Sequence, residues 1–165
     1  MAALIQGPAR VPSCVLTGKQ LDNFALFDLS GQPWEYRSHR GRLVLLDFWG
    51  TWCVYCLQSM PRLRILQDTY GRDGLEVIGI AYEDGNPQEQ ARKVASVRDR
   101  LQINYRLLLG SDMTTCPVKT QFRVTRFPTL ILLDENNRII WREEGLDDYR
   151  FQDLSMLIRQ HLRSR

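Results

Sequence analysis

Two cysteines separated by two residues, Cys53 and Cys56, are the side chains of this sequence best suited to chemistry. They follow the apolar run 43–48, which holds a single acid and predicts a strand buried on both faces. A helical pattern starts at Cys53, which places this thiol at the amino-terminal end of a helix. Free backbone N–H groups and the positive end of the helix dipole stabilise a thiolate there, and they lower its pKa below the free value of about 8.5. The spacing therefore predicts a redox-active dithiol.

The two cysteines are expected to have different roles. Cys53 is predicted to be the exposed thiol that attacks a substrate disulfide and forms a mixed disulfide. Cys56 lies one turn further along, on the face turned toward the core, and is predicted to resolve the mixed disulfide and leave the pair oxidised. A static disulfide or two buried cysteines is the structural alternative. The flanking Trp49 and Trp52 and the position at a helix start argue against it.

Asp47 is the only acid in the apolar run. Burial would raise its pKa toward the range in which a carboxylate can take the proton of Cys56 during the resolving step. The alternative is that the alternation of the strand turns Asp47 outward, where its carboxylate is hydrogen-bonded. We expect the buried position and the role of general base.

The remaining cysteines and histidines do not complete a zinc site. One Cys-x-x-Cys supplies two of four ligands, and Cys14, Cys116, His39 and His161 show no paired spacing. We therefore expect neither a metal nor another cofactor. Cys14 and Cys116 fall in predicted loops, where they either stay free or form a second disulfide, which would indicate an oxidising compartment.

Periodicity and turn residues predict the elements that must position these side chains. Strands are expected at 24–29 and 34–36 as a hairpin, and at 43–48, 75–82, 105–109, 129–133 and 138–142. Helices are expected at 53–70, at 87–101 after a capping Asn86, at 117–122, and from 147 or 148 to the end of the chain. The order is a βαβ half followed by a ββα half, which predicts an α/β fold with helices on both faces of a mixed sheet.

Length and composition fit one globular domain, since the chain has 165 residues of which 44% are hydrophobic and 25% charged. The net charge of +3 comes from basic residues interspersed with acids, so no nucleic-acid partner is expected. No apolar stretch approaches the ~18 residues of a membrane span, and residues 1–7 lack the pattern of a signal peptide. As written, the sequence predicts a cytoplasmic monomer, or an envelope-facing one if a leader or anchor precedes it.

Taken together, these motifs resemble the thioredoxin-fold thiol:disulfide oxidoreductases. The resemblance spans about residues 22 to 163 and is carried by Phe48-Trp49-x-x-Trp52-Cys53-x-x-Cys56, by Asp47 and Pro61 on either side of it, and by Phe127-Pro128-Thr129. The predicted hairpin and the extra helix 87–101 are more similar to exported interchange proteins of the cytochrome c maturation type than to a minimal thioredoxin. The expected organisation is an extended lead-in over residues 1–20 and a thioredoxin-like domain over 21–165.

The resemblance implies further site residues and partners. A proline that enters a central strand cannot donate to the ladder, and in this family the bond before it, here Phe127–Pro128, is cis and packs against the active-site disulfide. The backbone of residue 127 is then free to pair with an extended substrate segment. The expected substrate-binding residues are Trp52, Val54, Tyr55, Phe127 and Pro128. The expected partners are protein disulfide or dithiol substrates and an upstream redox donor.

The sequence departs from the family pattern at several places. Val54-Tyr55 stands between the cysteines instead of Gly-Pro, Ser59 replaces a common glutamate, and no lysine occurs in 75–82 to pair with Asp47. The reduction potential therefore cannot be taken from related dithiols, which span roughly −270 to −120 mV. Two other functions fit such a fold, a redox-idle binding domain and a thiol peroxidase. The peroxidase is disfavoured because no proline stands four residues before Cys53.

Overall fold

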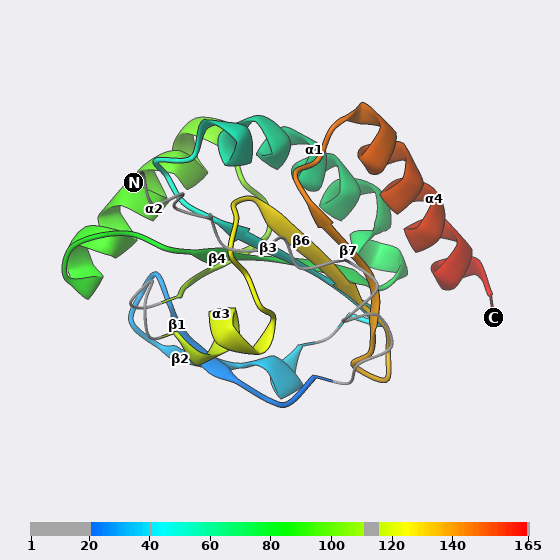
Figure 1. Ribbon diagram of the computed structural model, residues 1–165, viewed down its shortest axis with the longest axis horizontal. Helices are drawn as coiled ribbons and strands as arrows, with labels where there is room; N and C mark the ends of the chain where they lie inside the picture. The colour runs from blue at the N-terminus through cyan, green and yellow to red at the C-terminus, as the bar shows by residue number, and fades with distance from the viewer. Residues whose placement is uncertain (1–20, 40, 111–115, 165) are drawn as a thin grey trace, which may run out of the picture.

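The computed structural model describes residues 21–39, 41–110 and 116–164, and the predicted lead-in over residues 1–20 lies outside this part. Within the described residues, the strands form one sheet in the order β2-β1-β5-β4-β3-β6-β7 (Figure 1). The strands are β1 Ala25–Asp28, β2 Pro33–Glu35, β3 Leu43–Trp49, β4 Leu75–Ala81, β5 Arg106–Leu109, β6 Thr129–Leu133 and β7 Ile139–Glu144. The predicted strands are thus confirmed, with ends that move by one or two residues.

The sheet is mixed, as predicted. Strands β3, β4 and β5 run parallel, whereas β6 is antiparallel to β3 and β7 is antiparallel to β6. The hairpin β1–β2 joins the other edge, where β1 pairs antiparallel with β5. Every residue of β3 is buried, which confirms that the apolar run before the cysteines is a central strand.

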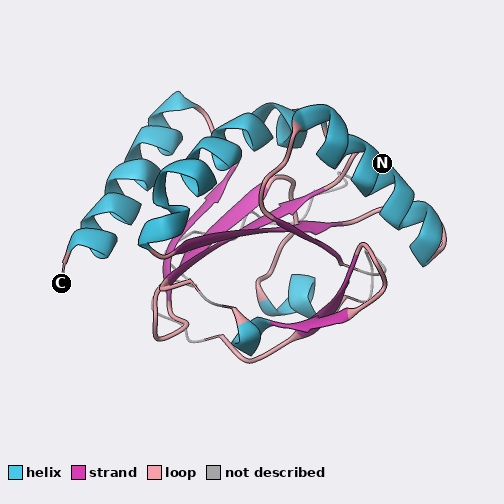
Figure 2. Cartoon of the chain, turned by 180° about the vertical axis from the view of Figure 1, so that it is seen from behind, coloured by secondary structure: helices cyan, strands magenta, loops and turns pink. Residues whose placement is uncertain are grey.

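The helices lie on both faces of the sheet, but unevenly. The helices α1 Val54–Tyr70, α2 Pro87–Leu101 and α4 Asp148–Arg163 cover one face, and the short α3 Pro117–Gln121 lies on the other (Figures 1 and 2). The connections β3–α1–β4 and β4–α2–β5 step across the sheet in the same direction. Because such crossovers are right-handed, α1 and α2 must lie on the same face.

Alternation along the strands separates two apolar cores. In β3, Leu45 and Trp49 belong to the core beneath α1, α2 and α4, whereas Leu46 and Phe48 belong to the core that includes α3 and the hairpin. Asp47 has the parity of Leu45 and Trp49, so its side chain lies on the α1 face.

The ends of the helices follow the signals in the sequence. Asn86 accepts a hydrogen bond from the N–H of Glu89, whose carboxylate accepts from the N–H of Asn86, and this capping box starts α2 with Pro87 at its first position. Asp147 caps α4 by accepting from the N–H of Arg150. In the described part of the chain, no helix has the length and apolar character needed to cross a bilayer.

Candidate active site

Cys53 and Cys56 form a disulfide at the amino-terminal end of α1, with Cα atoms 5.2 Å apart. Cys53 is the N-cap residue of the helix, and its Sγ accepts a hydrogen bond from the backbone N–H of Cys56 at 3.2 Å. The exposed fraction is 7% for Cys53 and 0% for Cys56. The prediction of an exposed Cys53 is therefore wrong in degree, because the folded chain covers most of this residue, but Cys53 is still the more accessible of the two cysteines. Its sulfur also has a backbone donor in place.

The first turn of α1 separates an apolar outer surface from the core. Val54 and Tyr55, which lie between the cysteines, are both more than half exposed. Below them, the buried face predicted from the helical spacing contains Cys56, Met60, Leu63 and Leu66. The helical spacing thus places the second cysteine inside, while the apolar side chains of Val54 and Tyr55 stay outside.

Asp47 is buried, as predicted, with an exposed fraction of 1%. Neither carboxylate oxygen has a hydrogen-bond partner among the described residues, and burial raises the pKa of Asp47 to about 8. In the ladder, Asp47 lies opposite Gly79 of β4 and Leu130 of β6. The strand residues directly beside it are therefore uncharged, which leaves desolvation as the dominant effect on this carboxyl.

Gly79 makes room beside Asp47 for two other side chains. A Cβ added at Gly79 would lie 2.7 Å from Cδ2 of Leu107 and 3.0 Å from Nε1 of Trp49. We expect Gly79→Ala to lower the free energy of unfolding by about 1–3 kcal/mol, because overpacking forces neighbours off their rotamers. Denaturant unfolding measures this change, and an unchanged midpoint would mean that Leu107 and Trp49 move aside at no cost.

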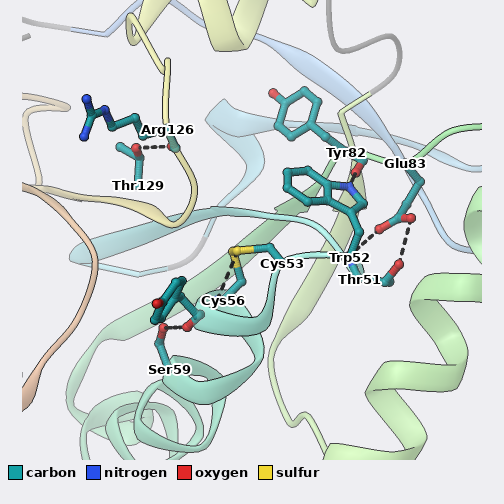
Figure 3. The surroundings of a disulfide bond; sticks show 10 residues. Thr51, Trp52, Cys53, Cys56, Ser59, Tyr82, Glu83, Arg126 and Thr129 are labelled. Carbon is teal, nitrogen blue, oxygen red and sulfur yellow. Dashed lines mark hydrogen bonds between the residues drawn. A yellow bond between two sulfur atoms is a disulfide. The ribbon is translucent and has the colours of Figure 1, made fainter. Parts of the chain in front are cut away.

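The cis bond expected between Phe127 and Pro128 is present. The ring of Phe127 lies edge-on to Trp52, with centroids 5.4 Å apart, and 5.6 Å from the ring of Tyr82. Trp52 is half exposed, and its Nε1 donates to the carbonyl oxygen of Tyr82 at 2.8 Å. Trp52 is therefore both packed and accessible, and it forms a fixed wall beside the disulfide (Figure 3).

A groove of about 410 Å³ has Phe127, the ring packed against Trp52, among its lining residues. It is lined by the first turns of α1, the Arg126–Pro128 segment and the β7–α4 connection, with the side chains of Tyr55, Ser59, Arg62, Arg126, Glu144 and Arg150. Ser59 donates its hydroxyl to the carbonyl oxygen of Tyr55 at 2.7 Å. The helix itself thus uses this hydroxyl, and no acid stands at this point of the groove.

The arginines of the groove differ in their partners. Arg62 binds Asp148 and the carbonyl of Leu146, and Arg150 pairs with Glu143 and Asp147. Arg126 has its Nε 3.9 Å from Glu144, and 55% of its side chain is exposed. Arg126 is thus the arginine of the three whose side chain is most open to solvent.

Glu83 is a site residue that no motif in the sequence indicated. It is 6% exposed and accepts hydrogen bonds from the N–H and the hydroxyl of Thr51, two residues before Cys53 (Figure 3). One signal was available: Glu83 follows a buried strand parallel to β3, and the carboxyl ends of parallel strands meet at one edge of the sheet.

The two remaining cysteines are distant from the redox helix in sequence. Cys116 is a buried thiol that has no disulfide partner among the described residues, and its Sγ lies 3.2 Å from the hydroxyl oxygen of Tyr82. The second disulfide considered above would join it to Cys14 and stays a prediction. Cys14 lies outside the described residues. Over the described ranges, no group of three histidine, cysteine or acidic side chains is arranged to hold a metal ion.

Comparisons with known proteins agree with this geometry. A model of the Redoxin family matches residues 16–157. The thiol-disulfide oxidoreductase ResA of Halalkalibacterium halodurans is 30% identical over 128 residues, which cover 78% of this chain and 68% of that protein. The thioredoxin-like protein YneN of Bacillus subtilis is 30% identical over 122 residues, which cover 74% and 68%. The thioredoxin domain of a thiol-disulfide oxidoreductase from Bacteroides vulgatus shares the fold, with a TM-score of 0.73 at 19% identity over 86% of this chain and 97% of that one.

Proposed function

This chain belongs to the Redoxin family and is a thiol:disulfide oxidoreductase, and from this premise we propose that it exchanges electrons with protein disulfides through Cys53 and Cys56. The observation that carries the proposal is the placement of the disulfide. It lies at the start of α1, the N–H of Cys56 points at the sulfur of Cys53, and the aromatic wall of Trp52 and Phe127 stands beside it.

In the proposed reaction, the Cys53 thiolate attacks one sulfur of a substrate disulfide. A mixed disulfide forms, and the other substrate sulfur leaves as a thiolate. Cys56 then transfers its proton to Asp47 and attacks the sulfur of Cys53, which forms the Cys53–Cys56 bond and expels the second substrate thiolate. The substrate gains two electrons and the enzyme dithiol loses two, so a further dithiol donor must reduce the enzyme before the next cycle.

Substrate is proposed to bind over the apolar rim of Trp52, Val54 and Tyr55. These exposed side chains surround a cysteine that is itself almost buried, so a substrate disulfide must approach with apolar neighbours that displace water from the rim. An extended substrate segment is proposed to pair with the backbone of residue 127, which lies just before β6. The groove beyond Tyr55 then receives the continuation of this segment.

Arg126 is expected to give the groove a preference for acidic segments. The test uses two disulfide-linked peptides that are identical except for one residue near the cysteine, which is Asp in one and Lys in the other. The protein should reduce the Asp peptide faster than the Lys peptide. Arg126→Glu should reverse the order by about two- to fivefold, because an exposed charge pair contributes little. Rates of thiol release measure the preference. Arg163→Glu makes the same charge change at the carboxyl-terminal end of α4, whereas the groove lies at its amino-terminal end. This control should keep the parental preference between the two peptides. A change of preference of equal size in both variants would contradict a local effect of Arg126.

A redox titration with mass-spectrometric mapping of the alkylated thiols tests the proposed function. The expected result is one two-electron couple confined to Cys53 and Cys56, with Cys116 in the same state throughout. If the Cys53–Cys56 disulfide bond neither forms nor breaks across the range of thiol buffers, the result would instead indicate a redox-idle domain.

A further inference from the structure

The turn that precedes Cys53 is held by a buried carboxylate. Thr51 donates its backbone N–H to one oxygen of Glu83 at 2.5 Å and its hydroxyl to the other at 2.8 Å. Two hydrogen bonds from one residue to the same carboxylate fix both the backbone and the side chain of that residue. Thr51 is therefore clamped to Glu83 (Figure 3).

The clamp continues a row of contacts between the ends of β3 and β4. The N–H of Tyr82 donates to the carbonyl oxygen of Trp49 at 2.9 Å, and Nε1 of Trp52 donates to the carbonyl oxygen of Tyr82 at 2.8 Å. The segment 49–52 is thus hydrogen-bonded to residues 82–83 through Trp49, Thr51 and Trp52. Within the turn, the N–H of Cys53 donates to the carbonyl oxygen of Gly50 at 3.1 Å, so the position of Cys53 follows from that of the clamped residues.

Glu83 is itself fixed from the side of α2. Nε2 of Gln90 donates to the carbonyl oxygens of Glu83 at 3.0 Å and of Gly85 at 2.9 Å. The first turn of the crossover helix therefore holds the backbone on which the clamping carboxylate stands. A rigid second layer of this kind is what keeps a reacting group within a fraction of an ångström of its working position.

We propose that Glu83 is a positioning residue for Cys53 and acts through Thr51. By fixing the turn, it keeps Cys53 at the N-cap of α1, where the N–H of Cys56 meets its sulfur. This inference rests on the proposed role of Cys53 as the attacking thiol. A displacement of about 1 Å at a reacting atom can slow a reaction about 100-fold, so loss of the clamp should appear in the rate of attack.

The test compares variants that break the clamp with one that preserves it. Glu83→Ala removes both acceptors, and Thr51→Val removes the hydroxyl bond alone. Glu83→Gln loses the charge but keeps both bonds, since its amide oxygen accepts from the N–H of Thr51 and its amide N–H donates to the hydroxyl. Asp134→Ala serves as the matched control, because it removes a carboxylate that accepts two backbone hydrogen bonds in the turn between β6 and β7, at the end of β6 away from Pro128.

The measurement is the rate at which each reduced protein reduces 5,5′-dithiobis(2-nitrobenzoate) at neutral pH, beside its denaturant midpoint. One probe molecule accepts the two electrons of the dithiol and leaves as two thiolates. We expect Glu83→Ala to react about 10- to 100-fold more slowly, Thr51→Val to be intermediate, and Glu83→Gln to stay within about threefold of the parent. Asp134→Ala should lower the midpoint and leave the rate unchanged.

A Glu83→Ala protein that reacts at the parental rate would overturn the inference, and so would a Glu83→Gln protein as slow as Glu83→Ala. If Glu83→Ala does not fold, Thr51→Val decides the matter by the same comparison with Glu83→Gln. Cys53→Ser separates the two levels of the proposal. A Cys53→Ser protein that keeps the parental rate would refute the assignment of the attacking thiol, whereas a clamp variant with the parental rate refutes only the role of Glu83.

Discussion

Cys56→Ser is expected to stop multiple turnover and to accumulate a mixed disulfide between Cys53 and the substrate. The attack by Cys53 remains, but the thiol that resolves the intermediate is gone, so the turnover rate should fall at least about 1000-fold. Cys53→Ser should show the same loss without trapping any substrate. Non-reducing electrophoresis and intact-mass measurement detect the trapped species.

The two cysteine variants are expected to differ because Cys53 and Cys56 differ in burial and because Cys53 lies at the start of α1. Cys56 is fully covered, whereas Cys53 reaches the surface among exposed apolar side chains and its sulfur accepts a backbone N–H. A substrate disulfide can therefore meet Cys53 but not Cys56. Cys116→Ser is the matched control, since its buried side chain keeps a polar contact with Tyr82 and it should trap nothing and leave turnover intact. Trapping by Cys53→Ser in place of Cys56→Ser would invert the two roles.

Asp47→Asn is expected to slow the resolving step by about 100-fold, which is the lower range for a lost general base. Burial raises the pKa of Asp47 to about 8, so in the parent protein the rate of this step should rise with pH as the carboxyl ionises. The variant cannot ionise here and should lose that rise. Rapid-quench measurement of the second thiol released isolates the step, and the first thiol released is the internal control.

Asp47→Asn should raise the free energy of unfolding near pH 8, although it slows the resolving step. The folded-state pKa of Asp47 lies above the ordinary aspartate value of 3.8, so the folded protein holds a proton that the unfolded chain releases. Stability is therefore lost as pH rises from about 4 to about 8, by up to roughly 1.4 kcal/mol per pH unit, and stays level above that range. Asp47→Asn removes this loss, so its unfolding free energy should exceed that of the parent near pH 8 and approach it near pH 4. Parallel pH profiles of the two proteins would contradict a buried, shifted carboxyl.

Local patterns in the sequence were sufficient for the elements of the redox centre. The apolar run before the cysteines predicted a central strand, and all of β3 is buried. The helical spacing after Cys53 predicted the face of α1 that carries Cys56 inward. These inferences succeed because an apolar run and a helical period are patterns among residues that are close together in the sequence. The capping box of Asn86 and Glu89 is a local pattern of the same kind.

Partners distant in sequence were beyond such reasoning. Thr51 and Glu83 are 32 positions apart, and they meet because β3 and β4 are parallel neighbours in register. The neighbours of Asp47, which are Gly79 and Leu130, likewise follow from the pairing of three strands. No periodicity along one segment records which residue of another strand lies opposite it.

The sequence by itself therefore determined the chemistry, namely a dithiol at a helix start after a buried strand that contains one acid. The tertiary structure alone decided how this chemistry is held and presented. Right-handed crossovers and strand register bring Glu83 to Thr51 and Arg126 to the groove. The physical reason is that reactivity depends on residue type and local backbone, whereas positioning and specificity depend on contacts between segments that only the folded chain brings together.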